Sequence, residues 1–111
     1  MMSKIYLACP YSHKKEGVRL YRFKQANSAA SYLMQQGHIV FSPISMSHSI
    51  AVQEGLPLDW EFWEKFDRSF IEWCELLMVL KLKGFNNSVG ISNEIQIAKE
   101  LGKEIKYMDV I

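Results

Sequence analysis

Short apolar runs alternate along this chain with longer segments in which apolar side chains recur every three or four residues. The short runs have the length of strands, and they cover residues 4–9, 38–41, 76–82 and 104–108. The longer segments predict helices, and they cover about 15–36, 58–74 and the stretch after Ser88. No period is visible from Ser42 to Leu58, so we expect a long loop there.

This order of elements predicts an α/β fold. Strands that alternate with helices favour a parallel sheet, because a parallel connection needs a crossover and usually makes it with a helix. We therefore expect a single domain over residues 1–111, a three-layer αβα sandwich with a flavodoxin-like or Rossmann-like parallel sheet of four to five strands. Sheets of this kind bind ligands at the carboxyl ends of their strands.

Composition excludes several function classes. The formal net charge is only +1, which gives no basis for a nucleic-acid partner. Cys9 and Cys74 lie in apolar segments and are expected to be reduced and buried, and neither they nor the three histidines show zinc-type spacing. No segment has the length of a membrane span, and no nucleotide-binding glycine fingerprint is present. We expect a cytoplasmic protein without a metal or cofactor.

Two acidic residues interrupt the apolar faces of predicted helices. Glu94 lies between Ile91 and Ala98 on one helix, in a stripe of Ile91, Ile95, Ala98 and Leu101. On the preceding helix, Asp67 falls within the series Trp60, Trp63, Phe70 and Cys74. Ionised carboxylates are rarely buried without a partner, so both acids are expected to line a cavity at the sheet edge.

Ordinary ion pairing is the alternative for these acids. Glu94 would then pair with Lys99 or Lys103, and Asp67 with Arg68 or Lys65. If the two acids instead share a cavity, they suit glycosidic bond cleavage, in which one carboxylate attacks the anomeric carbon and another group handles the proton.

The loop before the third helix contains a serine and a glycine that suit a bound phosphate or sugar hydroxyl. Ser88 and Gly90 stand where backbone N–H groups are free at a helix start. The alternative is that Ser88 or Ser92 only caps the helix and Gly90 only makes a turn.

Taken together, these residues resemble the nucleoside 2-deoxyribosyltransferase superfamily, which includes deoxynucleoside-monophosphate N-glycosidases. The resemblance runs through "IYLACPY", "FDRSFIEWCELLMVL" and "SVGISNEIQIAKELGKEI". Further segments, "SPISMSH" and "DWEFW", are similar to a small uncharacterised DUF1937-type branch grouped with these enzymes. The motif positions here are Tyr6, Asp67 with Glu75, Gly90 with Glu94, then Ala98, Gly102 and Lys103.

The resemblance implies three catalytic roles and a substrate class. Glu94 would attack C1′ of a ribosyl or deoxyribosyl group, Asp67 would assist protonation of the departing base, and Tyr6 would orient Glu94 or the sugar. Ser88 and the Gly90 backbone would hold a 5′-phosphate. The implied partner is a small nucleoside or nucleotide. The chain is also expected to form a homo-oligomer, either a dimer or a tetramer.

Other candidates for substrate contacts carry plainer alternatives. Trp63 could stack a base or belong to the core. His48 could donate a proton, contact a phosphate or lie on the surface. Arg19 and Arg22 could each neutralise a phosphate or be ordinary solvated charges. A non-catalytic nucleotide-binding or regulatory module is the runner-up function. An oligomeric scaffold stabilised by the aromatic face is a third reading.

Overall fold

In the computed structural model, which describes residues 2–111, four parallel strands form one sheet in the order β2-β1-β3-β4. The strands are β1 (Lys4–Ala8), β2 (Ile39–Phe41), β3 (Leu76–Leu80) and β4 (Glu104–Met108). The helices are α1 (Glu16–Gln35), α2 (Pro43–Glu54), α3 (Trp60–Trp73) and α4 (Val89–Glu100), with a 3₁₀ turn, η1, at Phe85–Asn87. The predicted α/β fold with a parallel sheet is confirmed.

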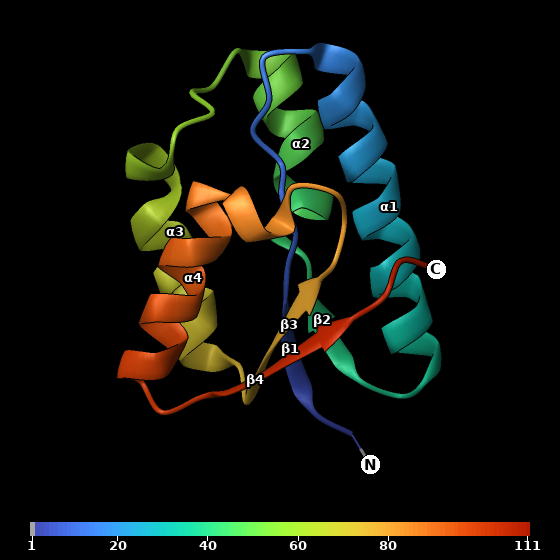
Figure 1. Ribbon diagram of the computed structural model, residues 1–111, viewed down its shortest axis with the longest axis vertical. Coiled ribbons are helices and arrows are strands. Elements are labelled where there is room, and N and C mark those ends of the chain that lie inside the picture. The colour runs from blue at the N-terminus through green and yellow to red at the C-terminus, as the bar shows by residue number, and fades with distance from the viewer. Residues whose placement is uncertain (1) are drawn as a thin grey trace.

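Helices cover both faces of the sheet. Figure 1 shows the strands between α1 and α2 on one side and α3 and α4 on the other. Strand β1 supplies both cores, since side chains alternate along a strand. Ile5 and Leu7 join the cluster that contains the alanines of α1, whereas Tyr6 and Ala8 join the cluster that contains Ile91 of α4.

Helix α1 packs through small side chains. Its buried residues are Ala26, Ala29, Ala30 and Leu33. Leu20, which lies on the predicted apolar stripe, is 42% exposed because it stands in the first turns, before the helix reaches the core. The chain leaves the helix at Gly37, whose φ of 95° favours glycine.

The prediction of a long loop from Ser42 to Leu58 is wrong, because helix α2 occupies most of it. Ser42 caps the helix by accepting a hydrogen bond from the Ser45 N–H, and Pro43 stands in the first turn, where proline is favoured. Gly55 ends the helix with a left-handed conformation. Because the segment is rich in serine and histidine, its apolar pattern is too weak to predict a helix. The buried face of the helix consists of Pro43, Ile44, His48 and Ala51.

Helices α3 and α4 each carry one acid inward. Asp67 and Ile71 are the buried residues of α3, and Ile91, Glu94, Ile97 and Ala98 are those of α4. Leu101, predicted on the same stripe, is 42% exposed because the helix ends at Glu100. Within residues 2–111, no helix is long and apolar enough to cross a membrane.

The expectation that the chain forms a homo-oligomer stays a prediction.

Candidate active site

A cavity of about 470 Å³ opens at the carboxyl ends of the central strands. Its walls come from the loops after β1 and β3, from α2, and from the starts of α3 and α4. Strands β1 and β3 are the neighbours at which the strand order reverses, and open α/β sheets bind ligands at such a position. The volume lies within the usual range for a small-molecule site.

Glu94 reaches this cavity from the first turns of α4. Its side chain lines the cavity although only 5% of the residue is exposed. Tyr6, fully buried on β1, donates a hydrogen bond from its hydroxyl to Oε2 of Glu94. The carboxylate is therefore held from the sheet side.

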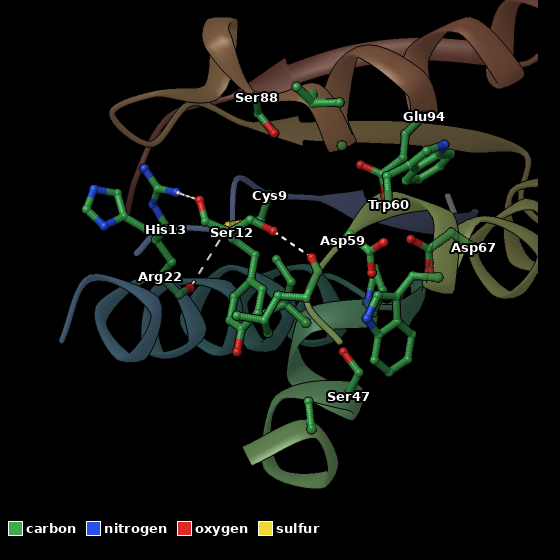
Figure 2. Close-up of a pocket in the computed structure, with 18 of the residues that line it drawn as sticks. Cys9, Ser12, His13, Arg22, Ser47, Asp59, Trp60, Asp67, Ser88 and Glu94 are labelled. Atoms are coloured by element: carbon green, nitrogen blue, oxygen red, sulfur yellow. Dashed lines mark hydrogen bonds between the residues drawn. The ribbon is translucent and has the colours of Figure 1, made fainter. Parts of the chain in front are cut away.

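Asp67 lines the same cavity from α3 (Figure 2). It is 8% exposed. The alternative of ordinary ion pairing is contradicted. Arg68 pairs with Glu64 at 3.3 Å, and the Lys103 ammonium donates to the carbonyl of Glu72 at 2.8 Å. In the described part of the chain, no ion pair joins a basic residue to Asp67 or Glu94.

Burial and mutual repulsion keep a proton on this pair near neutral pH. Burial raises the pKa of Glu94 to about 8, the charge of Asp67 adds to the effect, and the Tyr6 hydroxyl opposes it. Burial also raises the pKa of Asp67 to about 7, again opposed by Tyr6. The pKa of Tyr6 is raised by burial and by both acids, so its hydroxyl stays protonated. The two carboxyls titrate as a coupled pair.

An aromatic wall adjoins the acids. Trp60, Trp63 and Phe66 of α3 all line the cavity. Trp63 is oriented by a hydrogen bond from its ring N–H to the carbonyl of Pro57 at 2.8 Å, and its ring meets Phe66 edge to face. The wall therefore offers apolar surface of the kind that binds a heterocyclic base.

The remaining predicted site residues divide into two groups. Ser88 and Gly90 line the cavity, and Ser88 also caps α4, because its Oγ accepts the Ile91 N–H at 3.2 Å. His48 and Arg19 lie outside the lining. Arg19 instead donates to the carbonyl of His13.

His48 stands behind the cavity wall. It is 8% exposed, which contradicts the surface alternative, and it stacks on Phe23 with ring centroids 4.3 Å apart. Its Nδ1 lies 2.5 Å from the hydroxyl of Tyr11, which does line the cavity. Burial and the charge of Arg19 lower the pKa of His48, although Glu16 opposes this. His48 thus contacts a lining residue.

Sequence reasoning missed the lining residues Asn87 and Val89, which flank the start of α4. Arg22, predicted as a possible phosphate contact, lines the cavity one turn after Arg19, and Tyr11 and His13 of the loop after β1 line it as well. Asp59 takes the N-cap position of α3 but makes no capping hydrogen bond and lines the cavity instead. The loop after β1 could be expected at the site because it follows the carboxyl end of a strand. No cluster of three or more metal-ligating side chains exists among residues 2–111.

Comparisons with known proteins agree with this architecture. Residues 3–110 match the model of a family described as "Domain of unknown function (DUF1937)". A solved structure of a 2-deoxyribosyltransferase from the psychrotolerant bacterium Bacillus psychrosaccharolyticus is similar, with a TM-score of 0.64 and 25% identity. The alignment covers 96% of this chain and 72% of that one.

That enzyme is described as a biocatalyst for the synthesis of antiviral and antitumoral nucleosides. No curated protein matches the chain. The family match and the structural similarity together support a nucleoside 2-deoxyribosyltransferase-like relationship, which confirms the resemblance inferred from the sequence.

Proposed function

We propose that this chain, which belongs to the family described as "Domain of unknown function (DUF1937)", cleaves the N-glycosidic bond of a nucleoside or nucleotide. The observation that carries the proposal is the pair of acids, Glu94 and Asp67, buried in one cavity and forming no ion pair with a basic residue among residues 2–111. The similarity to a 2-deoxyribosyltransferase supports the same reaction class.

Glu94 is the nucleophile in this proposal. Its carboxylate oxygen forms a bond to C1′ while the C1′–N bond breaks, and the electron pair of that bond goes to the base nitrogen. Asp67 gives its proton to the departing base, either at the nitrogen of the broken bond or at another acceptor atom of the base. The hydrogen bond from Tyr6 keeps Glu94 in place for the attack. A water molecule or a second base then attacks C1′ and gives its proton to the ionised Asp67, while the C1′–O bond to Glu94 breaks and its electron pair returns to the Glu94 carboxylate.

The shared proton suits these roles. The productive state has Glu94 ionised and Asp67 protonated, so the pair must hold one proton and one negative charge. The pKa values of about 7 for Asp67 and about 8 for Glu94 support a pair that holds one proton near neutral pH. With this order the resting proton lies mostly on Glu94, and the productive state is the form in which that proton has moved to Asp67. Positive charge that develops on the sugar during bond cleavage further stabilises the ionised Glu94.

Base release is the direct test. The purified protein is incubated with a panel of nucleosides and 5′-monophosphates, with and without a free acceptor base, and products are separated by chromatography. We expect release or exchange by the wild type and a loss of roughly 10³-fold or more in Glu94→Gln, because the amide is a poor nucleophile.

Glu100→Gln is the matched control, because Glu100 lies on the exposed side of the same helix. It is expected to keep wild-type activity. Turnover that survives Glu94→Gln would refute the assigned role, and a complete absence of turnover with intact ligand binding would favour the binding-module alternative.

A further inference from the structure

We infer that His48 is a positioning residue for this cavity: it anchors the ring of Tyr11 as a fixed part of the wall, so that the bound substrate is held at the acid pair. The inference rests on the proposed function for the identity of the substrate. It gives a role to a buried imidazole that the acid pair does not use.

Tyr11 reaches the cavity from an irregular loop. It lines the cavity, yet residues 9–15, between β1 and α1, form no helix or strand. Within residues 2–111 its only hydrogen bond joins its hydroxyl to Nδ1 of His48, at 2.5 Å. A ring on such a loop keeps one orientation only where other side chains hold it. His48 therefore supplies the polar contact that fixes this part of the wall.

His48 is itself held on two sides. Its ring stacks on Phe23 of α1, with centroids 4.3 Å apart and planes inclined by 22°. It also meets the ring of Tyr11 edge to face, with centroids 5.5 Å apart. These contacts join α1, α2 and the loop after β1, so two packed helices determine where the loop residue lies.

The hydrogen bond runs from the Tyr11 hydroxyl to His48. Burial and the charge of Arg19 lower the pKa of His48, although Glu16 opposes this, so the imidazole is neutral at pH 7. Within residues 2–111, Nε2 of His48 has no hydrogen-bond partner, and no buried side-chain nitrogen or oxygen lacks one, so Nε2 reaches solvent and can carry the ring proton. Nδ1 then has a free lone pair for the hydroxyl proton.

Packing alone does not require a histidine at this position. The other buried residues of α2 are Pro43, Ile44 and Ala51, and a phenylalanine at position 48 would also stack on Phe23. Burying an imidazole costs free energy unless its nitrogens are hydrogen-bonded. The contact with Tyr11 is what a phenylalanine at this position would lack.

The side of the cavity that contains Tyr11 lies across from the nucleophile. Ser47 and Ala51 of α2 line this side together with Tyr11. Figure 2 shows Ser47 on the opposite side of the cavity from Glu94 of α4. A substrate between the two sides stays close to Glu94 only while the opposite wall stays in place. Attack at C1′ needs close approach and alignment, and a displacement of about 1 Å can cost roughly 100-fold in rate.

A double-mutant cycle tests whether His48 acts through the Tyr11 hydroxyl. His48→Phe keeps a ring for the stack on Phe23 and removes the acceptor, whereas Tyr11→Phe keeps the lining ring and removes the donor. Each is expected to lower kcat/KM for base release roughly 5–30-fold, with kcat falling more than KM rises. Because both remove the same hydrogen bond, the double variant should stay within about twofold of the weaker single variant.

Two further variants separate positioning from packing. In His48→Asn the side-chain carbonyl can accept near the position of Nδ1, so this variant should recover at least about a third of the wild-type kcat/KM. His38→Phe is the matched control, since Nδ1 of His38 accepts the Ser3 N–H at 3.1 Å outside the cavity lining. It should change kcat/KM less than about twofold. Urea midpoints report the stability of every variant, and His48→Leu replaces His48→Phe in the cycle if that variant does not fold.

Additive effects of the two substitutions would overturn the inference, as would variants that lose stability while kcat/KM and affinity stay at wild-type values. If the wild type releases no base, calorimetry with the same nucleosides and 5′-monophosphates measures the cycle as affinity. A non-additive loss of affinity would then support the inference and remove the proposed reaction. Base release with additive effects would do the opposite, and an absence of both turnover and binding would overturn both.

Discussion

The two faces of the sheet share the same strands but differ in what their side chains contact. On the α1 and α2 side, Ile5 and Leu7 of β1, with Cys9 just after the strand, belong to a cluster of buried apolar residues that includes three alanines of α1. On the α3 and α4 side, the alternate residues Tyr6 and Ala8 meet a layer that also contains two carboxyls. The comparison shows that one face supplies mainly packing, whereas the other gives up some packing to hold charge.

The difference has an energetic direction. Burying apolar surface stabilises the fold, whereas burying a carboxyl without a cation costs free energy or raises its pKa. The raised pKa values of Asp67 and Glu94 reflect this free-energy cost of burial. Substitutions on the two faces should therefore separate stability from activity.

Among the substitutions that keep the Glu94 nucleophile, the largest effect is expected for Asp67→Asn. Removing the general acid should lower kcat/KM roughly 10²–10⁴-fold for substrates whose base needs protonation. The wild-type pH profile should be bell-shaped, with limbs near the pKa values of about 7 and about 8.

In Asp67→Asn the alkaline limb should vanish and one limb, for ionisation of Glu94, should remain. Its pKa should lie below the wild-type Glu94 value of about 8, because the charge of Asp67 that raises it is gone. Steady-state kinetics from pH 5 to 10 measure both changes, with Glu64→Gln on the same helix as control. An unchanged profile would exclude Asp67 as the acid.

Leu7→Ala tests the packing face. Leu7 is fully buried against the α1 layer, so truncation should lower the free energy of unfolding by roughly 2–4 kcal/mol. Below the new unfolding transition, kcat should stay within about twofold of wild type. Urea unfolding and initial rates measure the two quantities, and a large fall in kcat in the folded variant would show that the faces are not separable.

The pH dependence of stability should come mainly from the charged face. Both acids have folded pKa values above their unfolded values of about 4, so the folded state binds more protons between about pH 4 and 8. Their contribution to stability is full below pH 4 and is lost as the pH rises through 7 and 8.

Glu94→Gln removes one of these titrations. Relative to wild type, it should gain roughly 1–3 kcal/mol of stability between pH 5 and 9. Denaturant midpoints across this range give the difference, and parallel curves for the two proteins would argue that the pKa of Glu94 is not raised.

Tyr6→Phe should have the smallest effect. It removes the donor to Glu94, so the pKa of Glu94 should rise and the acid limb of the rate profile should move to higher pH. We expect a loss of roughly tenfold in kcat/KM at pH 7. A profile that moves in the other direction would contradict the assigned hydrogen bond.

The sequence was sufficient for the fold and for the acid pair because both depend on periodicity. Glu94 and Asp67 could be singled out since a carboxylate within an apolar helical stripe conflicts with burial. Helix α2 was missed because serines dominate its composition, although Ser42, Pro43 and Gly55 are start and stop signals.

The cavity wall was harder to predict. Arg19 and Arg22 are three residues apart on α1, yet only Arg22 lines the cavity. Which of them faces inward depends on how the β1 loop and the β3 loop meet, and periodicity along a single helix does not contain that information. The same holds for His48, which contacts Tyr11 from a helix that was expected to be a loop.

The most direct test of the central claim is to detect the glycosyl group on Glu94. The protein is mixed with substrate in the absence of acceptor base, quenched in acid within milliseconds to seconds, and measured by intact and peptide mass spectrometry. The account predicts a mass increase of one sugar, or sugar phosphate, on the peptide that contains Glu94, and none in Glu94→Gln. Base release without any adduct, or an adduct on another residue, would contradict Glu94 as the nucleophile.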